Sequence, residues 1–204
     1  MEDLNWTYIL YLIVGIPSSL TLCIIAKKDK SLSTLFFGLA IISFLVGLII
    51  DFVIKDGVYL AREWGDLTGI TFILSALFIK TRNSKPVFAR FPLYLTLLPF
   101  IVLPFYPLVV NSGIVKDLLQ SIYQGGAIIV GLLVISINHF LYKGRGLLIF
   151  STLIFLLAFI IVSFLTNFFP QITVTLSNIL FSIGIIVATI GFKKVSDNRN
   201  TQII

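Results

Sequence analysis

Long apolar stretches alternate with short polar segments along the whole chain. The apolar stretches cover residues 6–26, 32–54, 59–79, 91–110, 115–140, 147–166 and 172–192. About 20 consecutive apolar residues are enough for an α-helix to cross the hydrocarbon core of a bilayer. The pattern therefore predicts an all-α fold, an integral membrane seven-helix bundle in residues 1–195. A short polar tail, residues 196–204, is expected to follow it.

The basic residues mark one side of this bundle. With the N-terminus outside, most of them fall in segments that face the cytoplasm: Lys27, Lys28, Lys30, Lys80, Arg82, Lys85, Arg90, Lys143, Arg145, Lys193, Lys194 and Arg199. Lysine and arginine are retained on the cytoplasmic side of membrane proteins. This alternation predicts an outside N-terminus, a cytoplasmic C-terminus and a location in the cytoplasmic (inner or plasma) membrane.

Composition supports a membrane class and excludes several others. Of the 204 residues 58% are hydrophobic and 12% are charged, whereas soluble domains carry about 25% charged residues. The bilayer is thus the expected partner. The net charge of +6 is explained by orientation in the membrane, so no nucleic-acid partner is expected. One cysteine and one histidine offer no metal-ligand set, and we expect neither a metal nor a cofactor.

Four prolines mark the fourth apolar stretch: Pro92, Pro99, Pro104 and Pro107. Proline inside a helix removes a backbone hydrogen bond and clashes with the preceding turn. We therefore predict a helix kinked at Pro99 and Pro104 and packed inside the bundle as a possible moving part. The alternative is that these prolines reflect only the higher proline content of membrane helices.

Polar residues gather in the outer halves of the stretches. Ionisable groups within membrane helices are costly and mark functional sites. An outward-facing polar pocket is predicted from these candidate ligand-binding residues: Asp51, Arg62, Glu63, Asp66, Gln120, Gln124 and Asn178. Gly125 and Gly126 are predicted to permit close helix approach or a hinge. The alternatives are a wetted outer loop for the acidic cluster and helix-joining amides for the other residues.

Aromatic residues stand near the expected outer ends of the stretches, among them Trp6, Tyr59, Trp64 and Tyr106. Tryptophan and tyrosine favour the membrane interface because their rings are part apolar and part polar. We interpret them as interfacial anchors.

A short internal similarity relates the second and sixth stretches. Residues 33–40 and 151–158 share six of eight amino acids. Two parallel three-helix repeats joined by the fourth helix are one interpretation, and such repeats occur in membrane transporters. Chance similarity within a restricted alphabet is the other.

No catalytic motif is present, and the last stretch has no lysine within the membrane to bear a retinal Schiff base, so an enzyme is not expected. The leading hypothesis is a transporter or channel-like subunit that takes a small molecule or ion from the outer side. The alternatives are a sensor or receptor that signals through a membrane or cytoplasmic protein partner, and a non-catalytic accessory or assembly subunit.

Overall fold

The computed structural model describes residues 6–53, 61–84, 90–109, 113–137, 145–165 and 168–201. All regular secondary structure in these ranges is helical, in eight elements. They are α1 (Trp6–Asp29), α2 (Leu32–Val53), α3 (Ala61–Ser84), η1 (Leu93–Ile101), α5 (Val102–Val109), α6 (Gly113–Ile137), α7 (Arg145–Leu165) and α8 (Pro170–Thr201). Within the described residues, the greater part of each expected apolar stretch is therefore helical. The helix α8 continues through Thr201, so part of the expected tail prolongs it.

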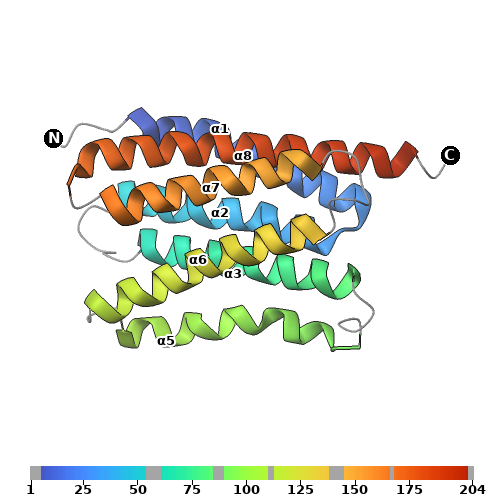
Figure 1. The fold of residues 1–204 in the computed structure, drawn as a ribbon, viewed down its shortest axis with the longest axis horizontal. Helices are drawn as coiled ribbons and strands as arrows, with labels where there is room; N and C mark the ends of the chain where they lie inside the picture. Colours follow the sequence, from blue (N-terminus) through green and yellow to red (C-terminus); the bar gives the residue numbers. More distant parts are fainter. Residues whose placement is uncertain are drawn as a thin grey trace.

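Six of these helices form a closed ring. Along the ring, α1 packs on α2, α2 on α3, α3 on α6, α6 on α7, α7 on α8, and α8 returns to α1. Successive helical segments run in alternating directions, with η1 and α5 acting as one segment (Figure 1). The starts of α1, α3, α6 and α8 thus lie at one end of the bundle. Below we call this the amino end, and the opposite end the carboxyl end.

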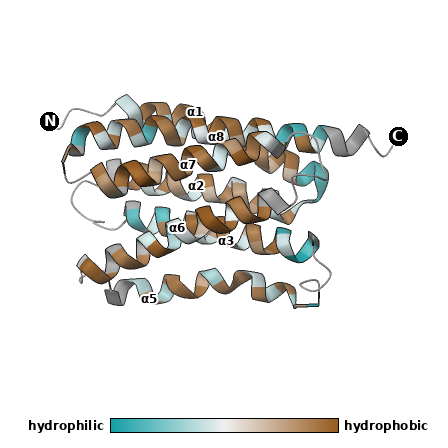
Figure 2. Ribbon diagram, viewed as in Figure 1, coloured by the Kyte–Doolittle hydropathy of each residue, from teal (hydrophilic) through white to brown (hydrophobic). Residues whose placement is uncertain are grey.

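The outer surface of the ring is apolar. Three helical segments, Trp6–Asp29, Leu32–Ile50 and Gln171–Asp197, are long and apolar enough to cross a membrane, and shorter apolar helices accompany them. Hydrophilic residues concentrate near the helix ends (Figure 2). Large apolar side chains lie exposed on every side, including Ile24, Val46, Phe105, Ile129, Phe150 and Ile183. Such a surface suits lipid, because an α-helix satisfies its own backbone hydrogen bonds without water.

Small residues allow the helices to approach closely. A Cβ atom added to Gly65 on α3 would lie 2.7 Å from both the Cα of Gly47 and the carbonyl oxygen of Ser43 on α2. Gly184 on α8 similarly accommodates the ring of Phe155 on α7. At this second contact the Ser151 hydroxyl donates a 2.8 Å hydrogen bond to the Gly184 carbonyl oxygen. Small residues and interhelical hydrogen bonds are the usual basis of helix packing in lipid.

An apolar cluster joins α1, α2, α7 and α8. Its buried members are Leu22, Ile41, Leu45 and Ile185. Half-buried aromatic side chains pack around them, notably Phe37, Phe155 and Phe192. The cluster extends from Tyr11 and Leu12, near the start of α1, to Phe192 near the carboxyl end of α8.

The fourth segment differs from the expectation. It is a 3-10 helix, η1, that contains Pro99 and continues as the α-helix α5, which contains Pro104. The expected position inside the bundle is wrong, because the segment lies outside the ring, against α3 and α6 (Figure 1). One of its sides is exposed at Leu97, Ile101 and Phe105. The physical reason is that its apolar residues surround the helix instead of forming one stripe, so lipid can cover the side that α3 does not.

The glycine pair on α6 does not interrupt that helix, which is continuous from Gly113 to Ile137. A Cβ atom at Gly125 would be in ordinary contact with the Phe159 ring at 3.8 Å, and one at Gly126 would meet open space. The role of these two glycines as a hinge stays a prediction.

The two similar segments occupy related positions. Ala40 on α2 and Ala158 on α7 are both fully buried, and Phe37 and Phe155 pack on the same apolar cluster. Within each half of the ring, three consecutive helices pack in chain order. These features are consistent with the predicted repeat, which stays a prediction.

Candidate functional site: a polar layer near the amino end

Contacts between helices identify which faces of α3 and α8 point into the ring. The Lys80 ammonium lies 5.9 Å from the centre of the Phe192 ring, and that ring lies 5.0 Å from the Phe37 ring of α2. Since α3 and α8 are not neighbours along the ring, a contact between them crosses its interior. Lys80 and Phe192 therefore mark the inward faces of their helices.

Asp66 lies close to the inward face of α3, and Asn178 lies between the inward face of α8 and the face that packs on α1. Asp66 precedes Lys80 by about four helical turns, and Asn178 precedes Phe192 by the same number of residues. The two helices run in the same direction, so both residues lie about 21 Å from the Lys80–Phe192 contact, toward the amino end. Both side chains are partly buried. By helix geometry, Asp66 and Asn178 thus lie at one level of the ring.

The helix α6 contributes Gln124 to the same region. A Cβ atom at Gly131 would lie within 4 Å of both Leu77 on α3 and Thr152 on α7, so Gly131 faces the interior where three helices meet. Gln124 lies two turns before Gly131, on the same face, and is partly buried. On α3, Ile70 likewise lies two turns before Leu77, so Gln124 is at the level of Ile70. This level is about one turn deeper in the bundle than Asp66.

Asn178 also joins two helices. Its Nδ2 donates a 3.0 Å hydrogen bond to the Oγ1 of Thr7 on α1, and Thr7 is fully buried. This contact matches the alternative interpretation, in which amides hold helices together. It also adds α1 to the helices that carry polar groups at this level.

Glu63 has a different partner. The Tyr106 hydroxyl on α5 donates a 2.9 Å hydrogen bond to Glu63 Oε2, and the rings of Trp64 and Tyr106 meet edge to face at 5.9 Å. Tyr106 is only 1% exposed, so its interpretation as an interfacial anchor is wrong. Glu63 and Tyr106 link α3 to the peripheral segment, and Glu63 is therefore at the border of the polar layer.

The remaining candidates are placed only by their backbone. Asp51 lies one turn beyond Gly47 on α2, at the amino end, while Arg62 starts α3 and Gln120 lies one turn before Gln124 on α6. Their side chains lie outside the described part of the structure.

Below the polar layer apolar side chains pack between the helices, and the Lys80 side chain of α3 lies over the Phe192 ring. Ile185 lies two turns deeper than Asn178 and belongs to the apolar cluster. Phe181 lies between these two levels and meets Phe155 at 5.6 Å. Toward the carboxyl end the Phe192 contacts follow. We call these three levels the inner apolar region.

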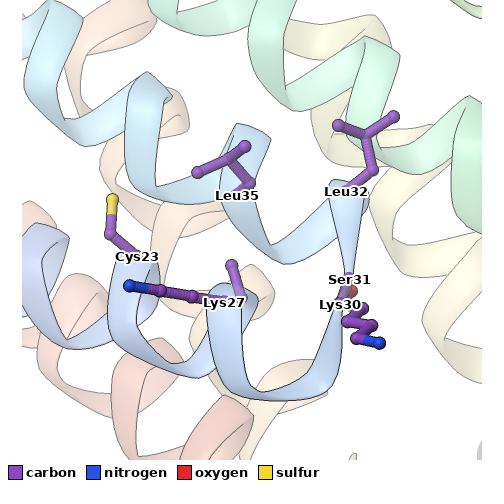
Figure 3. A pocket seen from close by; sticks show the side chains of 7 residues that line it. Cys23, Lys27, Lys30, Ser31, Leu32 and Leu35 are labelled. Carbon is purple, nitrogen blue, oxygen red and sulfur yellow. The ribbon is translucent and has the colours of Figure 1, made fainter.

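Several of these features were missed by sequence reasoning. Thr7, Tyr106 and Phe192 stand in apolar or terminal contexts, and their partners are distant in the chain. A further feature is an open depression of about 370 Å³ at the carboxyl end, between α1 and α2 (Figure 3). In the sequence only the lysines of this depression stand out, and their charge is also explained by orientation in the membrane.

The fold and the site together define a class. Long apolar helices, an apolar surface and a polar layer enclosed by the ring describe an all-α membrane protein. Among the described residues no group of three or more histidine, cysteine or acidic side chains could hold a metal ion. Comparisons with protein-family models, curated proteins and solved structures find no match for this chain.

Proposed function

We propose that this protein crosses the membrane seven times and binds a small polar molecule or ion in a pocket open to the outside. The segment formed by η1 and α5 counts as one crossing. The N-terminus is outside and the C-terminus is in the cytoplasm of a cell whose inner or plasma membrane holds the protein. Asp66, Gln124 and Asn178 contact the ligand, with Gln120 beside them and Asp51, Arg62 and Glu63 at the rim.

One observation carries this proposal. Polar residues from α3, α6 and α8 lie near one end of the ring. Deeper in the bundle the side chains packed between α1, α2, α7 and α8 are mostly apolar, and Lys80 of α3 lies over the Phe192 ring. Lipid-facing positions need no polar side chains, and Asn178 also bonds Thr7 on α1. A carboxylate beside amides is a set of hydrogen-bond acceptors and donors suited to a cation or a hydroxyl-rich solute.

The inner apolar region distinguishes modes of action. A permanently open pore would need a continuous polar path, and Phe155, Phe181 and Ile185 interrupt it. We therefore favour transport in which the pocket opens alternately to the two sides. The matching order of helices in the two halves of the ring supports this mode, because parallel repeats are common in such transporters.

Sensing is the second candidate, and it is supported by the same apolar region. Ligand binding at the outer side could shift the helices without permeation, and a membrane or cytoplasmic partner would receive the signal. An accessory subunit without a ligand is the third candidate, in which polar groups of this layer join helices, as Asn178 joins α8 to α1.

The binding step is tested on purified protein by thermal unfolding with sodium ions, glucose and a neutral amino acid as separate probes. A probe that binds the folded state raises the unfolding temperature in proportion to RT ln(1 + [L]/Kd). We expect one probe to raise the unfolding temperature of the wild type. Asp66→Asn and Gln124→Leu should each weaken the apparent affinity for that probe at least tenfold and so reduce the rise. Proteoliposome uptake of the same probe then separates transport from sensing.

Matched controls are available elsewhere in the chain. Asp197→Asn and Gln171→Leu make the same chemical changes at exposed positions of α8, and both should leave the rise intact. If Asp66→Asn and Gln124→Leu keep wild-type stability and do not change binding or flux, the pocket is not where we place it.

A further inference from the structure

The depression at the carboxyl end lies between the last turn of α1 and the first turn of α2. Its lining consists of Cys23, Ala26, Lys27, Lys30, Ser31, Leu32 and Leu35. In Figure 3, Cys23 and Lys27 extend from α1, Leu32 and Leu35 from α2, and Lys30 and Ser31 form the connecting turn. The lining is thus cationic at the rim and apolar on its walls.

The acidic side chain of this segment is bonded to another helix. Asp29 is the acid nearest in sequence, and its Oδ1 accepts a 2.9 Å hydrogen bond from the Ser196 hydroxyl on α8. Asp29 is absent from the lining of the depression. Lys27 and Lys30 are both exposed, so their ammonium groups give the rim a net positive charge.

Backbone groups add to this potential. Ser31 caps α2, since its Oγ accepts a 3.3 Å hydrogen bond from the Thr34 amide. The first amides of a helix lack intrahelical acceptors and carry the positive end of its dipole. The start of α2 therefore directs partial positive charge to the part of the depression where Lys30 stands.

The turn holds Lys30 in an unusual conformation. Lys30 has φ 49°, and the Ser31 amide donates a 3.0 Å hydrogen bond to the Ala26 carbonyl oxygen. This is the helix-ending arrangement in which glycine is normally preferred at the left-handed position. Lysine there sacrifices some stability, and a charge at the rim is a reason to retain it.

We propose that this depression binds the phosphate headgroup of an anionic phospholipid, with Lys27 and Lys30 on the phosphate and Leu32 and Leu35 along the start of an acyl chain. Lysines that serve only to orient the protein need no cavity. A cavity with cations at its rim and apolar walls fits an amphiphile with a negative head. The proposal requires only that the α1–α2 turn meets a membrane surface, and it is independent of the outer pocket.

Native mass spectrometry of protein purified with equal amounts of phosphatidylglycerol and phosphatidylcholine tests this. We expect the wild type to retain phosphatidylglycerol preferentially, and Lys27→Gln/Lys30→Gln to lose that preference by about tenfold. The control Lys193→Gln/Lys194→Gln removes two exposed lysines from the same end of the bundle but outside the depression, and should keep it. Equal loss in both variants would mean general charge attraction and would overturn the site.

A second variant separates charge from folding. Lys30→Gly removes the charge while relieving the left-handed strain, so it should weaken lipid retention while keeping or raising stability. Loss of retention only in variants that unfold more easily would contradict the proposal. A competition with millimolar inorganic phosphate distinguishes a site for the free anion from a lipid site. Phosphate would block a site for the free anion, whereas a lipid site would retain its lipid.

The single cysteine of the chain supplies an independent readout. Cys23 is partly exposed and lines the depression one turn from Lys27. A maleimide should label Cys23 several-fold more slowly in phosphatidylglycerol bilayers than in phosphatidylcholine bilayers. Equal rates of labelling in the two bilayers would count against occupancy by the anionic lipid.

Discussion

Single glycines determine how closely neighbouring helices approach. At Gly65 the backbones of α2 and α3 are so close that a methyl group would meet the Gly47 Cα and the Ser43 carbonyl oxygen. Backbone atoms cannot rotate away as a flexible side chain can. The contact between α2 and α3 therefore depends on the absence of one Cβ atom, in the manner of other small-residue interfaces.

Replacing Gly65 by alanine should separate α2 from α3. We expect Gly65→Ala to lower the free energy of unfolding by roughly 1–3 kcal/mol, as forced overpacking does elsewhere. Denaturant unfolding in mild detergent measures this. Gly126→Ala is the matched control, because its Cβ atom meets open space and alanine favours helix by up to about 1 kcal/mol. Equal effects at the two positions would contradict the packing argument.

Hydroxyl groups within the bundle differ in how they are satisfied. Half of the buried serine and threonine hydroxyls among the described residues donate to a carbonyl oxygen one turn earlier, as Thr71 does to Thr68. The buried Ser75 hydroxyl on α3 has no hydrogen-bond partner among the described residues. Ser75 lies one turn after Phe72, which packs edge to face on Phe100 of η1, so it lies near the side where the proline-containing segment packs.

Among the elements, the segment formed by η1 and α5 is the most weakly integrated. It is attached to α3 at three heights: by Tyr106 to Glu63 near the amino end, by Phe100 to Phe72 in the middle, and by the Arg82 side chain to the Phe91 carbonyl oxygen near the carboxyl end. Its 3-10 portion also has poorer hydrogen-bond geometry than an α-helix. Few contacts and weaker hydrogen bonds make local opening easier.

Hydrogen exchange should detect this difference. In lipid nanodiscs we expect amides of residues 93–109 to exchange faster than those of residues 66–77 in α3. Tyr106→Phe should accelerate exchange in α5 further, since it removes a hydrogen bond to a carboxylate worth about 1.5–3 kcal/mol. Exchange in α1 and α8 serves as the internal reference and should not change. Uniform protection across α3, η1 and α5 would show that the segment is as firmly held as the ring.

For the whole molecule, the arrangement of charge agrees with the arrangement of helices. Lys27, Lys80 and Lys193 come from three helices that all finish at the carboxyl end of the bundle. Contacts join these ends, as between Asp29 and Ser196. We expect this end to face the cytoplasm, because lysine and arginine are retained on that side of membrane proteins.

This orientation is tested with single cysteines introduced in a Cys23→Ser background. A maleimide that cannot cross membranes should label Glu2→Cys in intact cells and should label Gln202→Cys only after permeabilisation. An odd number of crossings requires the two ends to lie on opposite sides. Labelling of both ends from outside would require an even number of crossings and a new assignment of the polar layer.

The amino-acid sequence by itself determined the helical class and the approximate helix bounds. These properties are local: twenty apolar residues form a helix in lipid whatever their neighbours are, and each lysine acts near its own helix end. For example, the predicted stretch is 32–54 and the observed helix α2 is Leu32–Val53.

Only the tertiary structure decided which helices are neighbours. In lipid, apolar side chains are nearly as well solvated outside a bundle as within it, so hydropathy does not distinguish a central helix from a peripheral one. That choice depends on shape and on single hydrogen bonds between distant residues, such as Asn178 with Thr7 and Tyr106 with Glu63. The peripheral place of the proline-rich segment and the depression beside Lys27 follow from such contacts, which local hydrophobicity does not encode.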